Sequence, residues 1–469
     1  MLRRCLTVIP MMGLASCALP DTELWNDREK ARFTGLPSEV ATKVMVHGTA
    51  KSILSNPISG THKGMSMWWQ RSRLLSDSLL KQRPLLEKSY EKGNNIEEAL
   101  DLMKLPKGLP GKVECLVDGP EFFKALKHSV RNARTRVDTQ VFIFDNDDVA
   151  TGYADLLRQR SEEIECRVLM DRLGSIAGWW SPPSTPMPEG FQPPSSMPHY
   201  LEEDSKVKVR ESANPWLVAD HTKLIMIDGK EAYLGGMNIG REYLHEWHDM
   251  MVRVTGPVTT DLQNIFDHTW KQQGTFGDWD TLFHRKKKPE LVEGEEGLYP
   301  VRLLRTGPGV TDIEKAILVA IRMSRKEIFL QNSYVTSEVL LQELLVAMKR
   351  GVKVNFIYPK INDSPLMAIA NRRFAAPLLE AGANVFVYPE FSHIKAVIVD
   401  DWACLGSANL DGLSLRINSE LNIAYSDPRA VGELRKRIFE KDIKKSRELK
   451  KGQLKVTPDL LSDSVLQQL

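Results

Sequence analysis

Apolar residues along the centre of the chain switch repeatedly between helical and strand-like spacing. The stretch "DGPEFFKALKHSVRNARTRVDTQVFIF" (118–144) shows a Gly-Pro turn, an amphipathic helix and a strand carrying Gln140. The stretch "TGPGVTDIEKAILVAIRMSRKEIFLQNSYV" (306–335) repeats that order, with Gln331 in the strand. The hydrophobic pattern therefore predicts an internal repeat with a long period.

Both copies continue in parallel through a second helix, two buried strands and a further strand that starts with histidine. These segments are residues 150–163, 166–171, 206–211 and 221–228 in the first copy, and 337–351, 352–358, 384–390 and 393–400 in the second. Strands that alternate with helices predict layered α/β domains, and each copy has the length of one domain.

The expected fold is thus two tandem α/β domains, with a charged, aperiodic linker between them. Helical spacing also occurs before the repeat, within 67–93, and residues 94–104 resemble a short capped helix. We expect six segments: a signal peptide (1–16), an N-terminal extension (17–110), domain 1 (111–285), a linker (286–297), domain 2 (298–440) and a basic C-terminal tail (441–469).

The first residues form a candidate targeting signal. Arg3 and Arg4 precede an apolar stretch that is too short to span a bilayer as a helix, and "LASC" ends at Cys17. This pattern resembles a bacterial lipoprotein signal, in which the cysteine becomes the lipid-bearing first residue. Alanine at position 18 then indicates the outer membrane, on its periplasmic side. An ordinary secretory signal is the alternative.

Composition narrows the possible partners and the redox chemistry. The chain of 469 residues is 42% hydrophobic and 26% charged, with a formal net charge of +2, so charge alone gives no reason to expect nucleic acid as the partner. The five cysteines show no CxxC or metal-ligand spacing. Three of them lie in apolar runs and are expected to be buried thiols: Cys115, Cys166 and Cys404.

The pattern His-x-Lys-x-x-x-x-Asp occurs twice, as "HTKLIMID" and "HIKAVIVD". Side chains two positions apart share one face of an extended strand, so His221 and Lys223 point the same way, as do His393 and Lys395. The closing acids, Asp228 and Asp400, lie at an odd offset from the histidines. We expect these two acids to anchor turns, with direct catalysis as the less favoured role.

Two copies of the motif can meet at one cleft if the domains pack face to face about a pseudo-twofold axis. Two ammonium groups would then flank a phosphate diester, and Asn238 and Asn409, in "GGMN" and "GSAN", could add amide donors. One imidazole would attack phosphorus, while the other would protonate the leaving group and then activate the acceptor. Asp249 and Glu420, each eleven residues past an Asn, are candidates to orient the imidazoles.

At this point the sequence resembles the phospholipase D superfamily, with "HTKLIMIDGKEAYLGGMNIGREY" and "HIKAVIVDDWACLGSANLDGLSLRINSELN" most like its bacterial cardiolipin synthase branch. The resemblance implies two α/β/α sandwich domains with the site at their interface, a phosphohistidine intermediate and chemistry without metal or cofactor. It also implies that His221 is the nucleophile and His393 the general acid and base, although the residues alone leave the two symmetric. The expected substrate is a membrane phospholipid, with an alcohol or water as acceptor.

Two other functions are kept as alternatives. One is a nuclease or phosphodiesterase of the same superfamily, which would want a basic groove. The other is a non-catalytic lipid-binding envelope protein. The first copy also carries a proline-rich insertion, 178–200, which is either a plain surface loop or a flap whose Trp179 and Trp180 touch lipid.

Overall fold

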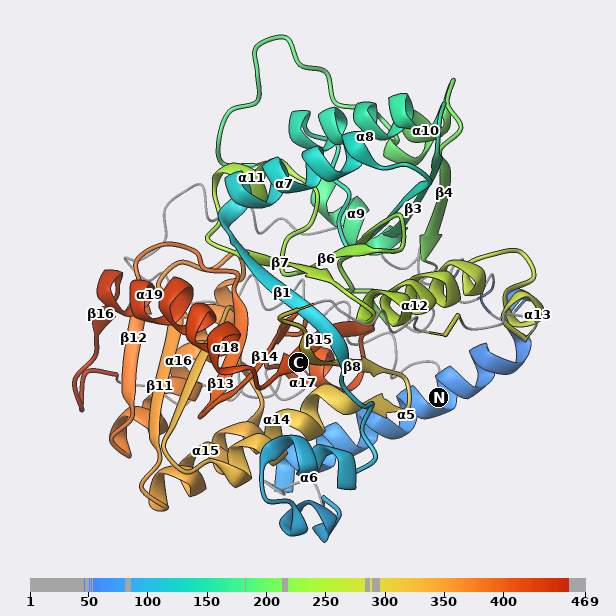
Figure 1. Cartoon of the computed structure of the whole chain (residues 1–469). Coiled ribbons are helices and arrows are strands. Elements are labelled where there is room, and N and C mark those ends of the chain that lie inside the picture. The colour runs from blue at the N-terminus through green and yellow to red at the C-terminus, as the bar shows by residue number, and fades with distance from the viewer. Residues whose placement is uncertain are drawn as a thin grey trace.

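The computed structural model describes residues 46, 50, 52, 54–80, 86–181, 183–212, 218–282, 287–288 and 296–454. Two halves, each with its own helices and strands, surround a shared centre, and the N-terminal helix α5 runs along one side (Figure 1). The predicted signal peptide with Cys17 and most of the predicted linker lie outside the described residues.

Each half contains seven strands in the same chain order. In the first half these are β1 (Leu109–Val117), β2 (Arg136–Val141), β3 (Glu165–Asp171), β4 (Lys208–Ser212), β5 (Leu224–Ile227), β6 (Glu231–Gly235) and β7 (Met250–Thr255). In the second half they are β8 (Tyr299–Gly307), β10 (Glu327–Asn332), β11 (Lys353–Pro359), β12 (Asn384–Tyr388), β13 (Lys395–Val399), β14 (Trp402–Gly406) and β15 (Glu420–Tyr425). Two short strands accompany them, β9 (Val310–Thr311) and β16 (Arg447–Glu448).

Each half contains the two helices that the hydrophobic pattern predicts, and the structure adds further ones. The first half has α7 (Asp118–Asn132), α8 (Asp148–Arg160), α9 (Arg172–Trp179), α10 (Met197–Glu202), α11 (Arg241–His245), α12 (Val258–Gln272) and α13 (Gly277–Leu282). The second half has α14 (Asp312–Met323), α15 (Glu338–Lys349), α16 (Pro365–Glu380), α17 (Gly412–Arg416), α18 (Pro428–Leu434), the π-helical turn η4 (Arg435–Phe439) and α19 (Glu440–Lys445). Before the repeat lie α5 (Pro57–Leu80), η2 (Lys88–Lys92) and α6 (Ile96–Leu102).

The strand order is the same in both halves when it is followed outward from the centre of the sheet. It is β1-β7-β6-β5-β2-β3-β4 on one side and β8-β15-β14-β13-β10-β11-β12 on the other. The halves join where β1 pairs antiparallel with β8, with Leu109 opposite Val301. This mirrored order is the pseudo-twofold arrangement of two tandem α/β domains that the sequence predicts.

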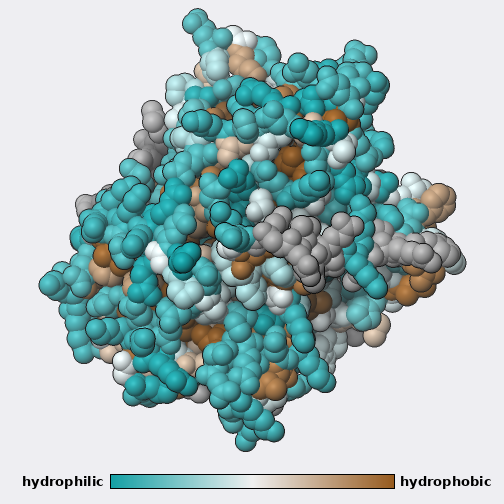
Figure 2. All heavy atoms as spheres, viewed as in Figure 1, coloured by the Kyte–Doolittle hydropathy of each residue, from teal (hydrophilic) through white to brown (hydrophobic). Residues whose placement is uncertain are grey.

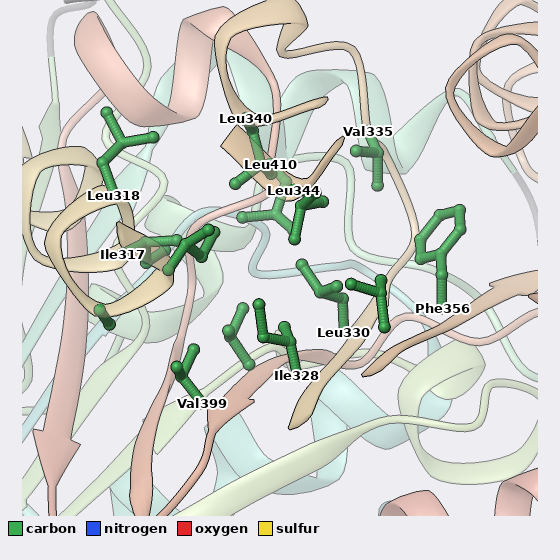
Figure 3. Packing of buried hydrophobic residues seen from close by; sticks show 14 of the residues in the cluster. Ile317, Leu318, Ile328, Leu330, Val335, Leu340, Leu344, Phe356, Val399 and Leu410 are labelled. Atoms are coloured by element: carbon green, nitrogen blue, oxygen red, sulfur yellow. The ribbon is translucent and has the colours of Figure 1, made fainter. Parts of the chain in front are cut away.

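Three large hydrophobic cores and one small cluster hold the layers of the described residues together, as expected when helices cover both faces of a sheet. In the second half, α14 and α15 pack on the sheet through residues such as Ile317 and Leu344, which meet Ile328, Leu330 and Phe356 (Figure 3). Helices α7 and α8 cover the first half in the same way.

The third core lies between the halves. It takes Leu224 from the first half, Ile398 from the second, Phe266 from α12 and Leu434 from α18. The two sheets therefore share one buried layer, which fixes their relative position through apolar packing.

The N-terminal extension is built into the structure by polar contacts. Asp278 of α13 accepts hydrogen bonds from the backbone N–H groups of Ile58 and Ser59, at 2.9 and 3.1 Å, at the start of α5. Asn95 accepts from the N–H of Glu98 at 2.9 Å, so the predicted capped helix is confirmed as α6. No helix of the described residues combines the length and apolarity that crossing a bilayer would need.

The end of the chain differs from the expected tail. Residues 441–448 continue the second half, because β16 pairs with β12 and Asp442 is buried against the side chains of Gln331 and His248. The basic composition of this segment did not indicate its burial, since its lysines are exposed while Asp442 and Ile443 make contacts inside the fold.

The two tryptophans at the start of the proline-rich insertion are placed differently. The indole of Trp179 donates a hydrogen bond to the carbonyl of Phe144 at 2.9 Å and packs against the first-half core, so this half-buried side chain is anchored to the first half. Trp180, the next residue, is exposed. The surface in Figure 2 is largely hydrophilic, with small separate apolar areas.

Candidate active site

Each motif histidine is held by an acid from the other half of the chain. The Nδ1 atom of His221 lies 3.0 Å from both carboxylate oxygens of Glu420. The Nδ1 atom of His393 lies 2.7 Å from Oδ2 of Asp249. An ionised carboxylate only accepts hydrogen bonds, so each acid in that form favours the tautomer with the proton on Nδ1 and leaves Nε2 free. Burial raises the pKa of Asp249 to about 7, against the pull of Lys395.

Backbone contacts between the halves bring these pairs together. The N–H of His221 donates to the carbonyl of Ser419 at 2.9 Å, and the N–H of His393 donates to the carbonyl of His248 at 2.7 Å. Ser419 and His248 each precede an orienting acid, so the same cross-connection is made twice. The pairing of the two segments, not side-chain contact alone, therefore sets each histidine beside the acid of the opposite half.

The two lysines lie on the same side as the histidines, as the two-residue spacing predicts. Lys223 Nζ donates to the carbonyl of His221, and Lys395 Nζ to that of His393, both at 2.8 Å. Both ammonium groups are buried. Lys395 also reaches the hydroxyl of Ser333 at 3.3 Å.

Burial and mutual repulsion weaken the positive charge of the site. Burial lowers the pKa of Lys223 to about 7, with Glu420 opposing and Lys395 adding to the shift. Burial lowers the pKa of Lys395 to about 8, against the pull of Asp249. The pKa of His221 is lowered by burial against Glu420, and that of His393 falls well below its usual range through burial and both lysines.

These couplings show that the four basic groups of the two motifs converge. The positive charges of His221 and Lys223 lower the pKa of His393, and that of Lys395 lowers the pKa of His221, although these residues are far apart in the sequence. Two lysines that repel one another in a dry site form a receptor for an anion, because a bound negative charge removes the repulsion.

Aromatic rings surround the two histidines unequally. Phe142 is the ring beside His221, 4.9 Å between centroids, and Lys223 Nζ lies 5.2 Å from the centre of the same ring. His393 is bordered by Trp247 at 5.2 Å, and more distantly by Tyr243 and Phe391. More rings therefore border His393 than His221, although the stronger lowering of its pKa comes from burial and from the charges of Lys395, Lys223 and His221, without the opposing effect that Glu420 has on His221.

The two orienting acids fit differently shaped surroundings. Ser407 donates a hydrogen bond to Glu420 at 2.6 Å. At the matching position of the first half stands Gly236, where a Cβ atom would lie only 2.2 Å from Oδ1 of Asp249. The longer acid thus has a hydroxyl partner and the shorter acid has a glycine, so the difference between "GSAN" and "GGMN" follows from side-chain packing.

The two asparagines are less alike than their motif suggests. Asn238 accepts from the N–H of Ile143 at 3.0 Å and donates to the hydroxyl of Tyr243 at 2.7 Å, so its amide supports the loop after β2. The Oδ1 atom of Asn409 is buried and accepts no hydrogen bond from a described residue. Of the two predicted amide donors, Asn238 is therefore engaged in structural contacts.

The last residue of each motif anchors a turn. Asp228 accepts from the N–H groups of residues 134–136 at 2.7 to 3.0 Å, and Asp400 from those of residues 325–327 at 2.8 to 2.9 Å. Both acids adopt a left-handed backbone, with φ of 53° and 52°. Partial burial opposes ionisation of Asp228, but these hydrogen bonds outweigh it and lower its pKa. Neither carboxylate is directed at a histidine.

Several residues around the site have no sequence motif of their own. Phe142 and Ser333 follow the strand glutamines by two positions, so their matched places in the repeat were a usable signal. Trp247 and His248 come directly before Asp249, at the positions that Asn418 and Ser419 take before Glu420. Only an alignment of the two copies at these acids would have pointed to them. Among the described residues, no cluster of three or more His, Cys, Asp or Glu side chains could ligate a metal. Cys115, Cys166 and Cys404 are buried free thiols, as predicted.

Comparison with known proteins agrees with this geometry. The sequence family described as "Cardiolipin synthase, PLD-like domain" matches residues 126–270 and 317–443, one segment in each half. Cardiolipin synthase 1 of Bacillus cereus is 28% identical over 356 residues, which cover 71% of this chain and 67% of that protein. Cardiolipin synthase A of Pseudomonas fluorescens is 29% identical over 381 residues, covering 74% and 73%.

A solved structure shares the fold. Phosphatidylserine synthase of Haemophilus influenzae superposes with a TM-score of 0.60 at 17% identity, over 79% of this chain and 96% of that one. The matched family covers more than half of the sequence and contains both motif pairs. The chain therefore belongs to the phospholipase D superfamily, in its bacterial cardiolipin synthase branch.

Proposed function

We propose that this protein is a phosphatidyltransferase that forms cardiolipin-like lipids by moving a phosphatidyl group from one phospholipid to the alcohol of another. The observation that carries the proposal is the crosswise pairing of His221 with Glu420 and of His393 with Asp249. This pairing supports a site in which each imidazole keeps its Nε2 atom free, next to two buried ammonium groups. The names of the similar proteins agree with this class of substrate.

In the proposed first step, Nε2 of His221 attacks the phosphorus of the donor lipid. A P–N bond forms, and the P–O bond to the head-group alcohol breaks. The departing oxygen takes a proton from Nε2 of His393, and Lys223 and Lys395 balance the charge on the non-bridging oxygens. The product of this step is a phosphatidyl group held on His221.

In the proposed second step, neutral His393 removes the proton of an acceptor alcohol. The alcohol oxygen attacks phosphorus, the P–N bond breaks and His221 is regenerated. His393 must carry a proton to begin the cycle, yet burial and both lysines lower its pKa in the empty site. A bound phosphodiester anion raises that pKa again, so protonation of His393 should accompany substrate binding.

The experiment that tests this function is product analysis with purified protein and phosphatidylglycerol. We expect cardiolipin and glycerol as products, and none from a His221→Ala variant with an unchanged circular dichroism spectrum. Phosphatidic acid as the sole product would indicate that water is the acceptor. No turnover of any phospholipid, together with cleavage of DNA, would contradict the proposal.

We also propose a location in the bacterial cell envelope, through acyl chains on Cys17. Incorporation of labelled palmitate by the wild-type chain, but not by a Cys17→Ser variant, would support this anchor. Equal labelling of the two proteins, or none of either, would count against it.

A further inference from the structure

A polar cavity of about 190 Å³ lies on the opposite side of the His221 segment from the catalytic groups. Asp220 and Thr222 line it, and they alternate with His221 and Lys223 along an extended backbone, so they face the other way. Glu420 borders both spaces. A single water needs roughly 10–15 Å³ of such volume, so the cavity can hold a larger polar group.

The N-terminal extension, which has no counterpart in the repeat, supplies one wall of this cavity. Lys63 of α5 lines it together with Ser52, Ser55 and Asn56. Arg305 of β8 lies on the wall contributed by the second half. In Figure 1, α5 passes from α13 of the first half toward the helices of the second half, so its contacts extend over both halves.

The other half of the molecule fills the equivalent space. The short bridges Asp220–Ser419 and Ser392–His248 correspond under the pseudo-twofold symmetry. His248 stacks on Tyr388 with 4.9 Å between ring centroids, and its two nitrogens lie 2.6 and 2.8 Å from Asp118 and Asp442. On the cavity side, the small residue Ser419 stands at the position of this imidazole. The opening is therefore specific to the half that the N-terminal extension covers.

The acidic and the basic side chains around the cavity differ in their partners. Its two acids already have partners: Asp220 accepts from the side-chain amide of Gln140 at 2.8 Å, and Glu420 binds His221 and Ser407. Lys63 donates to the side-chain carbonyl of Gln272 at 2.9 Å. Within the described part of the chain, neither Lys63 nor Arg305 forms an ion pair.

The two cations differ in exposure, because Lys63 is half-buried and Arg305 is exposed, and neither has a close counter-ion among the described residues. Burial lowers the pKa of Lys63, and Asp220 and Asp278 oppose that shift from a distance. Arg305 lines the same cavity and stays accessible to a ligand. A negatively charged group in the cavity could bind both cations, and Arg offers the forked donors that suit phosphate oxygens.

We propose that the cavity lined by Lys63 and Arg305 is a second phosphate-binding site, separate from the catalytic one between the two histidines. Its ligand is a phosphate monoester or diester group, carried either by a lipid head group or by free phosphate. The lipid source rests on the proposed function, in which two phosphate-bearing lipids meet and only one phosphorus lies between the histidines.

Calorimetric titration of the full-length protein with inorganic phosphate tests the site. We expect two phosphates per wild-type chain, one of which is lost in Lys223→Met/Lys395→Met and the other weakened at least about tenfold in Arg305→Gln or Lys63→Gln. Lys230→Gln, which removes an exposed charge in a turn of the first half, is the matched control and should retain both sites.

The outcomes separate this inference from the proposed function. One phosphate per chain, lost in Lys223→Met/Lys395→Met and unaffected by Arg305→Gln, would overturn the second site and leave the catalytic proposal intact. Loss through Arg305→Gln, with no effect of the double lysine variant, would support the second site and count against the catalytic one.

A variant that fills the cavity tests the site without removing a charge, in case the charge variants misfold. Ser419→His places an imidazole where His248 fills the other half, and it should abolish the second phosphate while the thermal unfolding transition stays cooperative. A folded Ser419→His protein that still binds two phosphates would overturn the proposal. In the double lysine background, titration with short-chain phosphatidylglycerol identifies the source: binding that weakens in Arg305→Gln indicates a lipid head group, whereas binding of inorganic phosphate alone indicates the free anion.

Discussion

The Nδ1 atom of His221, in the first half of the chain, lies 3.0 Å from the carboxylate oxygens of Glu420, in the second half. His393 and Asp249 repeat this relationship in the opposite direction at 2.7 Å. Neither motif histidine therefore has its orienting acid in its own half. The site depends on the packing of the halves against each other, through β1 with β8 and through the shared apolar core.

Replacement of Glu420 should impair the chemistry more than substrate binding. In Glu420→Gln the amide can donate to Nδ1, which would favour the tautomer with the proton on Nε2 and block nucleophilic attack. We expect kcat to fall about 100- to 10,000-fold while KM changes little. Steady-state kinetics with phosphatidylglycerol measures this, and Glu433→Gln, an exposed acid on α18, is a control. A full retention of kcat would show that Glu420 does not orient His221.

Anion binding should weaken as pH rises, because the site loses positive charge. Burial lowers the pKa of Lys223 to about 7 and that of Lys395 to about 8, so the ammonium groups lose their protons progressively as pH rises through these values. We expect the affinity of the catalytic site for dimethyl phosphate, a diester that stays a monoanion throughout this range, to fall at least about tenfold between pH 6.5 and 9. The measurement is calorimetry in the Arg305→Gln background, and a flat profile would argue against the lowered pKa values.

His248 should stabilise the fold in a pH-dependent way. Burial opposes its charge, but the hydrogen bonds with Asp118 and Asp442 dominate and raise its pKa to about 9. A raised pKa contributes stability that is complete below the ordinary value of about 6.5 and is lost as pH rises through 9. His248→Gln should therefore lower the free energy of unfolding by about 3 kcal/mol at pH 6 and by clearly less at pH 10. Urea unfolding at both pH values checks this, and an equal loss at each would exclude the charge as the cause.

Asp228 should matter for stability and not for catalysis. Its carboxylate accepts three backbone N–H groups in the turn before β2, so Asp228→Ala leaves those donors unsatisfied and places alanine at a φ of 53°. We expect a loss of about 2–4 kcal/mol in the free energy of unfolding, with normal kcat for the folded fraction. Thermal melts and activity at low temperature separate the two effects. A folded but inactive variant would indicate that Asp228 takes part in catalysis.

The repeat made much of this arrangement predictable from sequence. Strand and helix order could be predicted because the spacing of apolar residues differs between them, and the shared face of His221 and Lys223 follows from strand geometry. The odd offset of Asp228 correctly placed it away from the histidine. These inferences depend on local backbone geometry, which the sequence specifies directly.

Contacts between the halves could not be predicted in the same way. The duplicated spacing identified Asp249 and Glu420, but a symmetric pattern cannot tell whether an acid serves the histidine of its own half or of the other. The engagement of Asn238 by Tyr243, and the burial of Asp442 within a basic segment, also depend on tertiary packing. The sequence also left the position of Trp179 open, because its indole hydrogen bond is made to a loop 35 residues away.

The most direct test of the account is to find where the phosphatidyl group becomes attached during turnover. Wild-type protein mixed with phosphatidylglycerol, quenched rapidly into alkaline denaturant and digested, should yield a peptide whose added mass lies on His221, and the adduct should be absent from His221→Ala. An adduct on another residue, or none in a protein that is turning over, would contradict a mechanism in which the two halves converge on one phosphorus atom.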